Sequence, residues 1–99
     1  MVRSNIDVNK LEAAASKLRA ISHPMRIAIM DLLSKGNKMS VTDIHKALNI
    51  GQAAASHHLS ILKNKGVLVS ERDGKNIYYK LRSTILTEII DCVNRRNEF

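Results

Sequence analysis

The stretch from Gly51 to Lys65, GQAAASHHLSILKNK, carries the side chains best suited to binding a polyanion. At about 100° per residue, its polar side chains fall within an arc of roughly 140° on one side of a helix, and mostly apolar ones fill the remainder. Short polar groups let a helix approach a nucleic-acid groove closely and still reach base edges and phosphate oxygens. The arc consists of Gln52, Ala53, Ser56, His57, Ser60, Lys63 and Asn64 and has no acidic member, which indicates a polyanionic partner. Within it, the residues we expect to contact DNA are Gln52, Ser56, His57, Ser60 and Lys63.

The four histidines are better explained by DNA contact and packing than by metal binding. Adjacent residues of a helix point about 100° apart, so His57 and His58 cannot readily share one ion. We assign His57 to DNA contact and His58, on the apolar side, to packing. His45 is expected at the surface or facing phosphate, and His23 is expected to have a structural role at a helix start.

Positive charge is concentrated in one part of the chain. The net charge is +7, and residues 45–82 contain seven Lys or Arg against the two acids Glu71 and Asp73, which leaves +5 in this segment. A basic patch on one contiguous segment fits a nucleic-acid partner. Charge alone does not decide the function, since many basic proteins do not bind DNA.

Length and composition predict one small globular domain covering residues 1–99. Hydrophobic residues make up 44% of the chain and only three residues are aromatic, so the core must be aliphatic. No apolar run reaches the roughly 18 residues of a membrane span, and the N-terminus lacks a signal peptide, so we expect a cytoplasmic protein. The single cysteine, Cys92, excludes an intrachain disulfide and a CxxC zinc site. It is either a small apolar filler or a thiol that pairs with its mate across a dimer.

Helical periodicity and capping residues place three helices before the opening stretch. The spacing predicts helices over residues 8–21, 24–34 and 41–48. Ser22 is expected to cap the second, Lys35-Gly36 to end it, and Ser40 with Asp43 to form a capping box for the third. The inward side chains are expected to be Met25, Ile29, Leu32 and Leu33 on the second helix, and Val41, Ile44, Ala47 and Leu48 on the third.

The tight break Asn49-Ile50-Gly51 makes the third helix and the opening stretch a helix-turn-helix. After Gly66 the pattern changes to two strand-like runs, 67–72 and 76–81, around an Asp-Gly turn. Tyr78 and Tyr79 alternate across the second run, one toward the core and one toward solvent or phosphate. We expect this hairpin to be a basic wing whose DNA-binding side chains are Arg72, Lys75 and Asn76.

Amphipathic helices at both ends of the chain predict a dimer. A last helix, capped by Ser83, is expected over residues 84–96, and it carries an aliphatic stripe like that of the first helix, 8–21. A small aliphatic domain often gains burial by pairing with a second copy. The predicted dimer-interface residues are Leu11, Leu18, Ile85, Ile89 and Val93.

The chain resembles the ArsR-type (ArsR/SmtB) family of small bacterial winged-helix repressors. The phrases LRAISHPMRIAIMDLL and ASHHLSILKNKGVLVSERDGKNIYYKL carry the likeness, which covers roughly residues 11 to 95. It implies a mainly α winged helix-turn-helix fold, with four helices, a β-hairpin wing and a fifth helix that pairs with the first across a two-fold axis. It also implies that the fourth helix enters the major groove, where Gln52, Ser56 and His57 match DNA-contacting positions. Ala53 departs from the family, because a hydroxyl residue is common there.

The usual inducer sites of such repressors are absent from this sequence. Residues 38–46, KMSVTDIHK, lack the third-helix cysteines, and the last helix has no histidine for the fifth-helix metal site. A two-cysteine redox switch needs a second cysteine. We therefore predict no metal site and no cofactor.

These observations predict a homodimeric, sequence-specific repressor that binds a pseudo-palindromic double-stranded DNA operator. Its two recognition helices would lie about one turn of DNA apart, roughly 34–36 Å. Phosphate contacts from Lys63, Arg72 and Lys75 would position it, and Gln52, Ser56 and His57 would read base edges. The alternatives are a metal- or redox-responsive repressor with a non-standard site, and a winged helix used for protein contacts. No nucleophile–base or acid pair at recognisable spacing indicates an enzyme.

Overall fold

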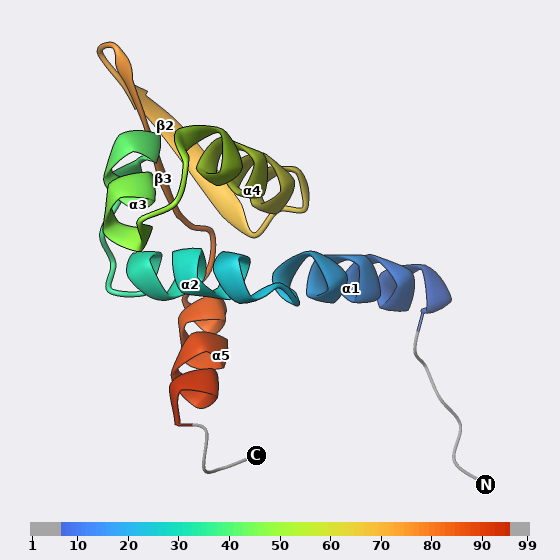
Figure 1. Cartoon of the computed structure of the whole chain (residues 1–99). Helices are drawn as coiled ribbons and strands as arrows, with labels where there is room; N and C mark the ends of the chain where they lie inside the picture. Colours follow the sequence, from blue (N-terminus) through green and yellow to red (C-terminus); the bar gives the residue numbers. More distant parts are fainter. Residues whose placement is uncertain (1–6, 96–99) are drawn as a thin grey trace, which may run out of the picture.

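The computed structural model describes residues 7–95, except for the side chains of Thr84, Ile89, Val93 and Asn94. The elements follow the predicted order of four helices, a hairpin and a last helix, with one additional short strand before the third helix (Figure 1). In Figure 1, α2, α3, α4 and the hairpin gather together, while α1 and α5 extend away from them. The elements are α1 (Val8–Ile21), α2 (Pro24–Leu33), β1 (Met39–Ser40), α3 (Val41–Leu48), α4 (Gln52–Asn64), β2 (Leu68–Asp73), β3 (Asn76–Leu81) and α5 (Thr84–Asn94).

Side-chain caps fix where α3 and α5 begin, as predicted. Ser40 Oγ accepts a hydrogen bond from the Asp43 amide, and Asp43 Oδ2 accepts one from the Ser40 amide, both at 3.1 Å. Ser83 Oγ accepts from the Ile85 amide at 3.2 Å. These bonds satisfy amides that have no partner within the helix, so they define the first turn locally.

Helix α2 begins at Pro24 as predicted, but the residue that caps it differs from the prediction. Ser22 does not cap it but closes α1, since its amide and its hydroxyl both donate to the Leu18 carbonyl, at 2.9 and 2.8 Å. His23 is the N-cap, and its Nδ1 accepts from the Met25 amide at 3.1 Å. Pro24 occupies the first helical position, which leaves the cap to the residue directly before it. The structural role expected for His23 is confirmed, while the role expected for Ser22 was wrong.

The wing is a regular hairpin paired to the short strand β1. Its register runs from Leu68 opposite Leu81 to Asp73 opposite Asn76, and Gly74 in the two-residue loop has a φ of 64°, which favours glycine. β1 pairs antiparallel with β3, so the sheet order is β1-β3-β2. The sequence did not predict β1, because two residues are too short to show strand alternation.

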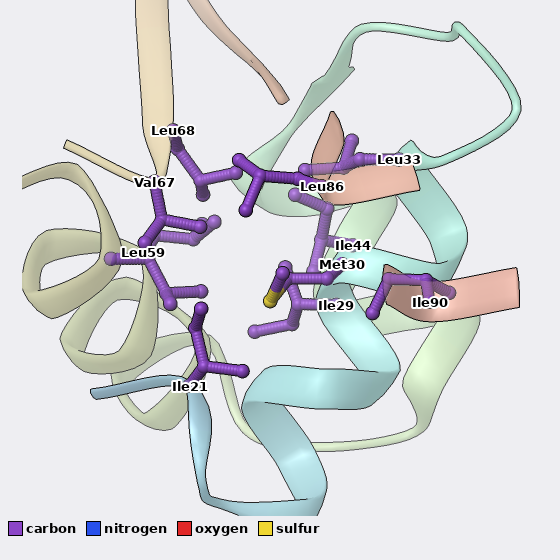
Figure 2. Close-up of a cluster of buried hydrophobic side chains, with 11 residues drawn as sticks. Ile21, Ile29, Met30, Leu33, Ile44, Leu59, Val67, Leu68, Leu86 and Ile90 are labelled. Carbon is purple, nitrogen blue, oxygen red and sulfur yellow. The ribbon is translucent and has the colours of Figure 1, made fainter. Parts of the chain in front are cut away.

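The core is aliphatic and lies where α2, α3, α4, the base of the hairpin and α5 meet (Figure 2). On α2, Ile29 and Leu33 are buried as expected. Met25 was also predicted to be buried but is only half-buried, whereas Met30, which was not predicted, is fully buried. On α3, Ile44 is buried and Ala47 is exposed, which corrects the prediction for Ala47. The remaining members of the buried cluster are Ile21, Leu59, Leu62, Val67, Leu68, Leu86 and Ile90.

Candidate nucleic-acid interface

Helix α4 presents its polar arc to solvent as its periodicity predicts. Ala55, Leu59 and Leu62 are fully buried, and they hold the opposite side of the helix against the core. Ala54 differs from the prediction, because it was placed on the apolar side and is exposed. Every predicted member of the arc is exposed: Gln52, Ala53, Ser56, His57, Ser60, Lys63 and Asn64. A continuous strip of hydroxyl, amide, imidazole and ammonium groups is therefore free to meet a groove.

A tight turn holds α4 against α3. Asn49 ends α3 in the left-handed conformation with a φ of 54°, and the Ile50 amide donates to the His45 carbonyl at 3.1 Å. The His45 ring is half-buried, and its Nδ1 lies 3.2 Å from the Ile50 carbonyl oxygen. His45 was expected at the surface or facing phosphate, but this contact makes it part of the turn. The two helices with this turn form a helix-turn-helix.

His58 lies behind the polar arc and contacts α2. Its ring is half-buried, and Nδ1 accepts a hydrogen bond from Arg26 Nε at 3.1 Å. The His23 ring is tilted against it with centroids 4.7 Å apart, while the His57 ring centroid is 5.9 Å away. Packing had been predicted for His58, and the structure adds a polar partner that the sequence did not reveal.

The surroundings of His58 favour its neutral form. Burial lowers the pKa of His58 below its usual 6.5, and the nearby groups of His23, Arg26 and His57 lower it further. Because Arg26 Nε is a donor, Nδ1 must carry a lone pair, so the proton of the neutral ring is on Nε2. The ring is thus held in one tautomer.

In Figure 1 the tip of the wing projects beyond α3 and α4, away from the rest of the molecule. Arg72, Lys75 and Asn76 are all exposed, as predicted. Lys38 pairs with Glu71 at 3.2 Å and lies 5.4 Å from the centre of the Tyr78 ring. This exposed ion pair neutralises Glu71, one of the two acidic residues of the hairpin. The sequence did not indicate a role for Lys38, because it lies in a loop more than thirty residues before Glu71.

The two wing tyrosines divide as expected. Tyr79 packs against the buried cluster, and Tyr78 lies on the other side of the strand next to Lys38. Both rings are half-buried. This alternation anchors β3 to the core by one side chain and leaves the other near the wing surface.

A further group of cations surrounds the turn that follows α4. Lys65 Nζ donates to Ser16 Oγ on α1 at 2.7 Å. Lys17 Nζ and Arg82 Nε lie 3.8 and 3.9 Å from the position that a Cβ on Gly66 would take. The positive region therefore also includes Lys17. This residue lies on α1, outside the basic segment 45–82 that the sequence indicates.

The terminal helices expose apolar side chains. Leu11 and Leu18 on α1 are 51% and 56% exposed, and Ile85 on α5 is 63% exposed. Of the α1 stripe predicted over residues 8–21, Ile21 is buried and Val8 is 68% exposed. The side chains of Ile89 and Val93 lie outside the described residues. No helix in the described part of the chain is both long and apolar enough to cross a membrane.

No metal-binding cluster is present among residues 7–95. No three His, Cys, Asp or Glu side chains of this range are gathered so that they could hold a metal ion. A hollow of about 120 Å³ lies between α2, β3 and α5, lined by side chains that include Leu33, Lys80 and Thr87. Cys92 is a half-buried free thiol.

Comparisons with known proteins agree with this architecture. Residues 23–70 match the model of the arsR family of bacterial regulatory proteins. The chain is 45% identical over 73 residues to the transcriptional repressor SdpR of Bacillus subtilis, covering 74% of this chain and 80% of SdpR. It is 34% identical over 93 residues to the transcriptional repressor PagR of Bacillus anthracis, covering 94% of this chain and 93% of PagR.

Solved structures share the fold. The crystal structure of PagR has a TM-score of 0.79 at 33% identity, over 88% of this chain and 99% of PagR. The solution structure of Mb0332 from Mycobacterium bovis, described as a homodimeric winged helix-turn-helix DNA-binding domain, has a TM-score of 0.83 at 23% identity, over 99% of this chain and 90% of that one. The predicted winged helix-turn-helix fold is confirmed.

The environment of His58 predicts how stability changes with pH. We expect its pKa, measured by NMR titration of the imidazole protons, to lie below 6.5. Since the unfolded chain then binds a proton more readily, the stability associated with neutral His58 is complete above pH 6.5. It is lost as the pH falls from 6.5 through the lower pKa of the folded state.

Urea unfolding of wild type and of His58→Asn across this range measures the effect. The wild type should lose more free energy of unfolding on acidification than the variant, because asparagine does not titrate. A His58 pKa at or above 6.5, or equal losses in the two proteins, contradicts the prediction.

Proposed function

This chain belongs to the ArsR family of bacterial regulatory proteins, and from that membership we propose that two copies repress transcription by binding one pseudo-palindromic operator. Members of this family are DNA-binding transcriptional regulators and not enzymes. We treat residues 1–99 as a single domain whose terminal helices, predicted over 8–21 and 84–96, form the dimer interface. Chromosomal DNA as the partner puts the site of action in the cytoplasm.

The observation that carries this proposal is the exposed polar arc of α4. Its residues occupy one side of the helix without an acid among them, and Ala55, Leu59 and Leu62 fix that side outward. A helix of this width fits the major groove of B-DNA, and short side chains let it approach the base edges. The basic hairpin next to it supplies a second point of contact. A protein-interaction module does not need an arc free of acids.

We assign different contacts to different parts of this surface. Gln52, Ser56 and His57 lie on the first half of α4 and read base edges, with Ser60 one turn further on. Cations at the edges bind phosphates, which positions the protein without reading sequence. These are Lys63 at the end of α4 and Arg72 and Lys75 on the wing, with Asn76 beside them.

Dimerisation is supported by apolar side chains that a lone protomer leaves in water. Leu11, Leu18 and Ile85 are each more than half exposed, on the two helices that extend furthest from the core in Figure 1. Ile89 and Val93 remain predicted members of the same interface. Covering these side chains removes apolar area from water and stabilises an assembly of two copies.

The signal that releases DNA could be a metal ion or an oxidant, or it could be neither. A metal- or redox-responsive repressor would need a non-standard site, for which His23, His45 and Cys92 are the first residues to test. Within residues 7–95, both histidine rings already have backbone partners. We therefore favour a repressor that does not use a metal ion or other cofactor.

Selection of bound fragments from a random DNA pool at physiological salt tests the proposed function. The expected result is an inverted repeat, with half-sites one helical turn apart. Fragments without such a repeat, or binding without sequence preference, would contradict a dimeric, sequence-specific repressor. Complete failure to bind DNA would favour the protein-interaction alternative.

The oligomeric state is a direct prediction. Light scattering at micromolar concentration should return about twice the chain mass of 11.1 kDa. Ile85→Glu should shift the protein toward monomer and weaken operator binding, because a buried unpaired carboxylate opposes association. Thr42→Glu, at an exposed position on α3, is the matched control and should stay dimeric. A wild-type mass near 11.1 kDa would refute the dimer.

Base reading and phosphate binding should separate by mutation. His57→Ala should weaken operator binding by roughly 1–3 kcal/mol and affect random DNA much less. Lys75→Ala should weaken both about equally and lower the salt slope by about one counterion. Lys35→Ala removes the same charge from the loop after α2 and should leave the slope nearly unchanged. Titrations by fluorescence anisotropy at several salt concentrations measure these effects, and equal losses for His57→Ala on both DNAs would remove His57 from the base-reading set.

Metal ions provide the test between the alternatives. Zinc, cadmium or arsenite at stoichiometric levels should leave the protein–operator complex intact in anisotropy measurements. EDTA-treated protein is the reference. Binding of one ion per subunit with loss of DNA affinity would instead establish a metal-sensing repressor.

A further inference from the structure

Arg26 connects three elements that meet behind the recognition face. Its Nη1 donates to the Ala20 carbonyl oxygen in the last turn of α1, and its Nε donates to His58 Nδ1 on α4, both at 3.1 Å. Arg26 itself is in the first turn of α2 and is half-buried. One guanidinium therefore links the helix proposed for dimerisation to the helix proposed for DNA reading.

The chemistry of this link needs an arginine. The last carbonyls of a helix have no partner within it, so the Ala20 carbonyl is free to accept from outside α1. A guanidinium has several donors in one rigid plane and can serve two acceptors in different directions. The ammonium of a lysine is a single point and cannot reproduce both bonds in this geometry.

The link acts directly behind the DNA-reading surface. His58 follows His57, which projects into solvent from the polar arc, and their ring centroids are 5.9 Å apart. A displacement of His58 therefore changes the position of His57 and of the helix that carries it. The other described polar tie between α1 and the α4 end, from Lys65 to Ser16, is exposed and involves a flexible side chain.

We propose that Arg26 is a positioning residue for DNA recognition: by joining Ala20 and His58, it fixes the angle of α4 relative to α1. This role rests on the proposed function, since it matters for affinity only when two α4 helices must meet two half-sites at once. In a dimer built on α1, the angle between α1 and α4 sets the separation of the two recognition helices. An unlinked α4 must be ordered by the DNA, which weakens binding.

The link also depends on the protonation state of His58. A protonated imidazole carries hydrogen on both nitrogens, so Nδ1 can no longer accept from Arg26. The groups facing His58 are His23 at the start of α2, Arg26 on α2 and His57 on α4. None of the three is an acid that would stabilise an imidazolium. Acidification therefore removes the acceptor and places two cations next to each other.

The first experiment compares two arginine variants. Arg26→Met keeps an unbranched apolar side chain but removes both hydrogen bonds, and Arg19→Met removes one charge from an exposed position on α1. The probe is the strongest-binding inverted repeat recovered from the random pool, titrated at pH 7.5 and physiological salt. Arg26→Met should bind about tenfold more weakly than wild type, whereas Arg19→Met should lose no more than about threefold. Equal affinities for the two variants overturn the proposal.

The second experiment uses pH and does not require Arg26 to be changed. Asparagine places its Oδ1 close to the position of Nδ1 and does not titrate, so His58→Asn keeps an acceptor at acid pH. The readout is the ratio of affinities at pH 7.5 and pH 5.0, which is independent of any overall loss in the variant. This ratio should be larger in wild type than in His58→Asn by about threefold or more.

The outcomes separate this inference from the proposed function. If wild type binds no DNA sequence specifically, the proposed function fails before the variants are compared. If wild type binds the repeat and the pH ratios of wild type and His58→Asn are equal, the positioning role alone is refuted. Circular dichroism at both pH values identifies a variant that does not fold, and if Arg26→Met is such a variant, the pH ratio decides the question.

Discussion

What α4 presents to DNA depends on how its opposite side is buried. Leu59 and Leu62 are fully buried, and burial of such side chains contributes about 1.5–3 kcal/mol each. Turning the helix by one residue, about 100°, would expose them and carry the polar arc toward the core. No single hydrogen bond in the interface offsets such a loss. The small Ala55, one turn before Leu59 and also fully buried, allows α4 to approach its neighbours closely. The hydrophobic core thus determines which side chains are available for recognition.

The charges around this helix are divided by position. α4 itself carries mostly neutral hydrogen-bonding groups on its exposed side, which suits the reading of base edges. The cations lie at its margins, on the wing and around the turn after Lys65, which suits contact with the phosphates on either side of a groove. Lys38 offsets Glu71 within the hairpin. Exposed pairs of this kind add little stability.

Within the described residues, helix α1 contacts the rest of the protein through its C-terminal half. Ala20 and Ile21 are buried, whereas Leu11 and Leu18 face solvent in the single chain. Its last turn is held to α2 and α4 by Arg26, so the orientation of α1 is tied to that of the recognition helix. A partner covering the exposed part of α1 would in this way be connected to the DNA-reading surface through a short polar path.

The sequence by itself determined the features that local pattern encodes. The helical periodicity predicted which side of α4 is polar and which is apolar. Capping residues predicted where α3 and α5 begin, and the Asp-Gly turn predicted the wing. Each of these signals lies within a few neighbouring residues. The tertiary structure decided the rest. β1 exists only because β3 lies beside it, and His45 is held by a carbonyl of the turn. The link from Arg26 to His58 joins residues 32 positions apart, for which no local period exists. Such contacts depend on how helices pack together, and that is settled by the shape of the whole core.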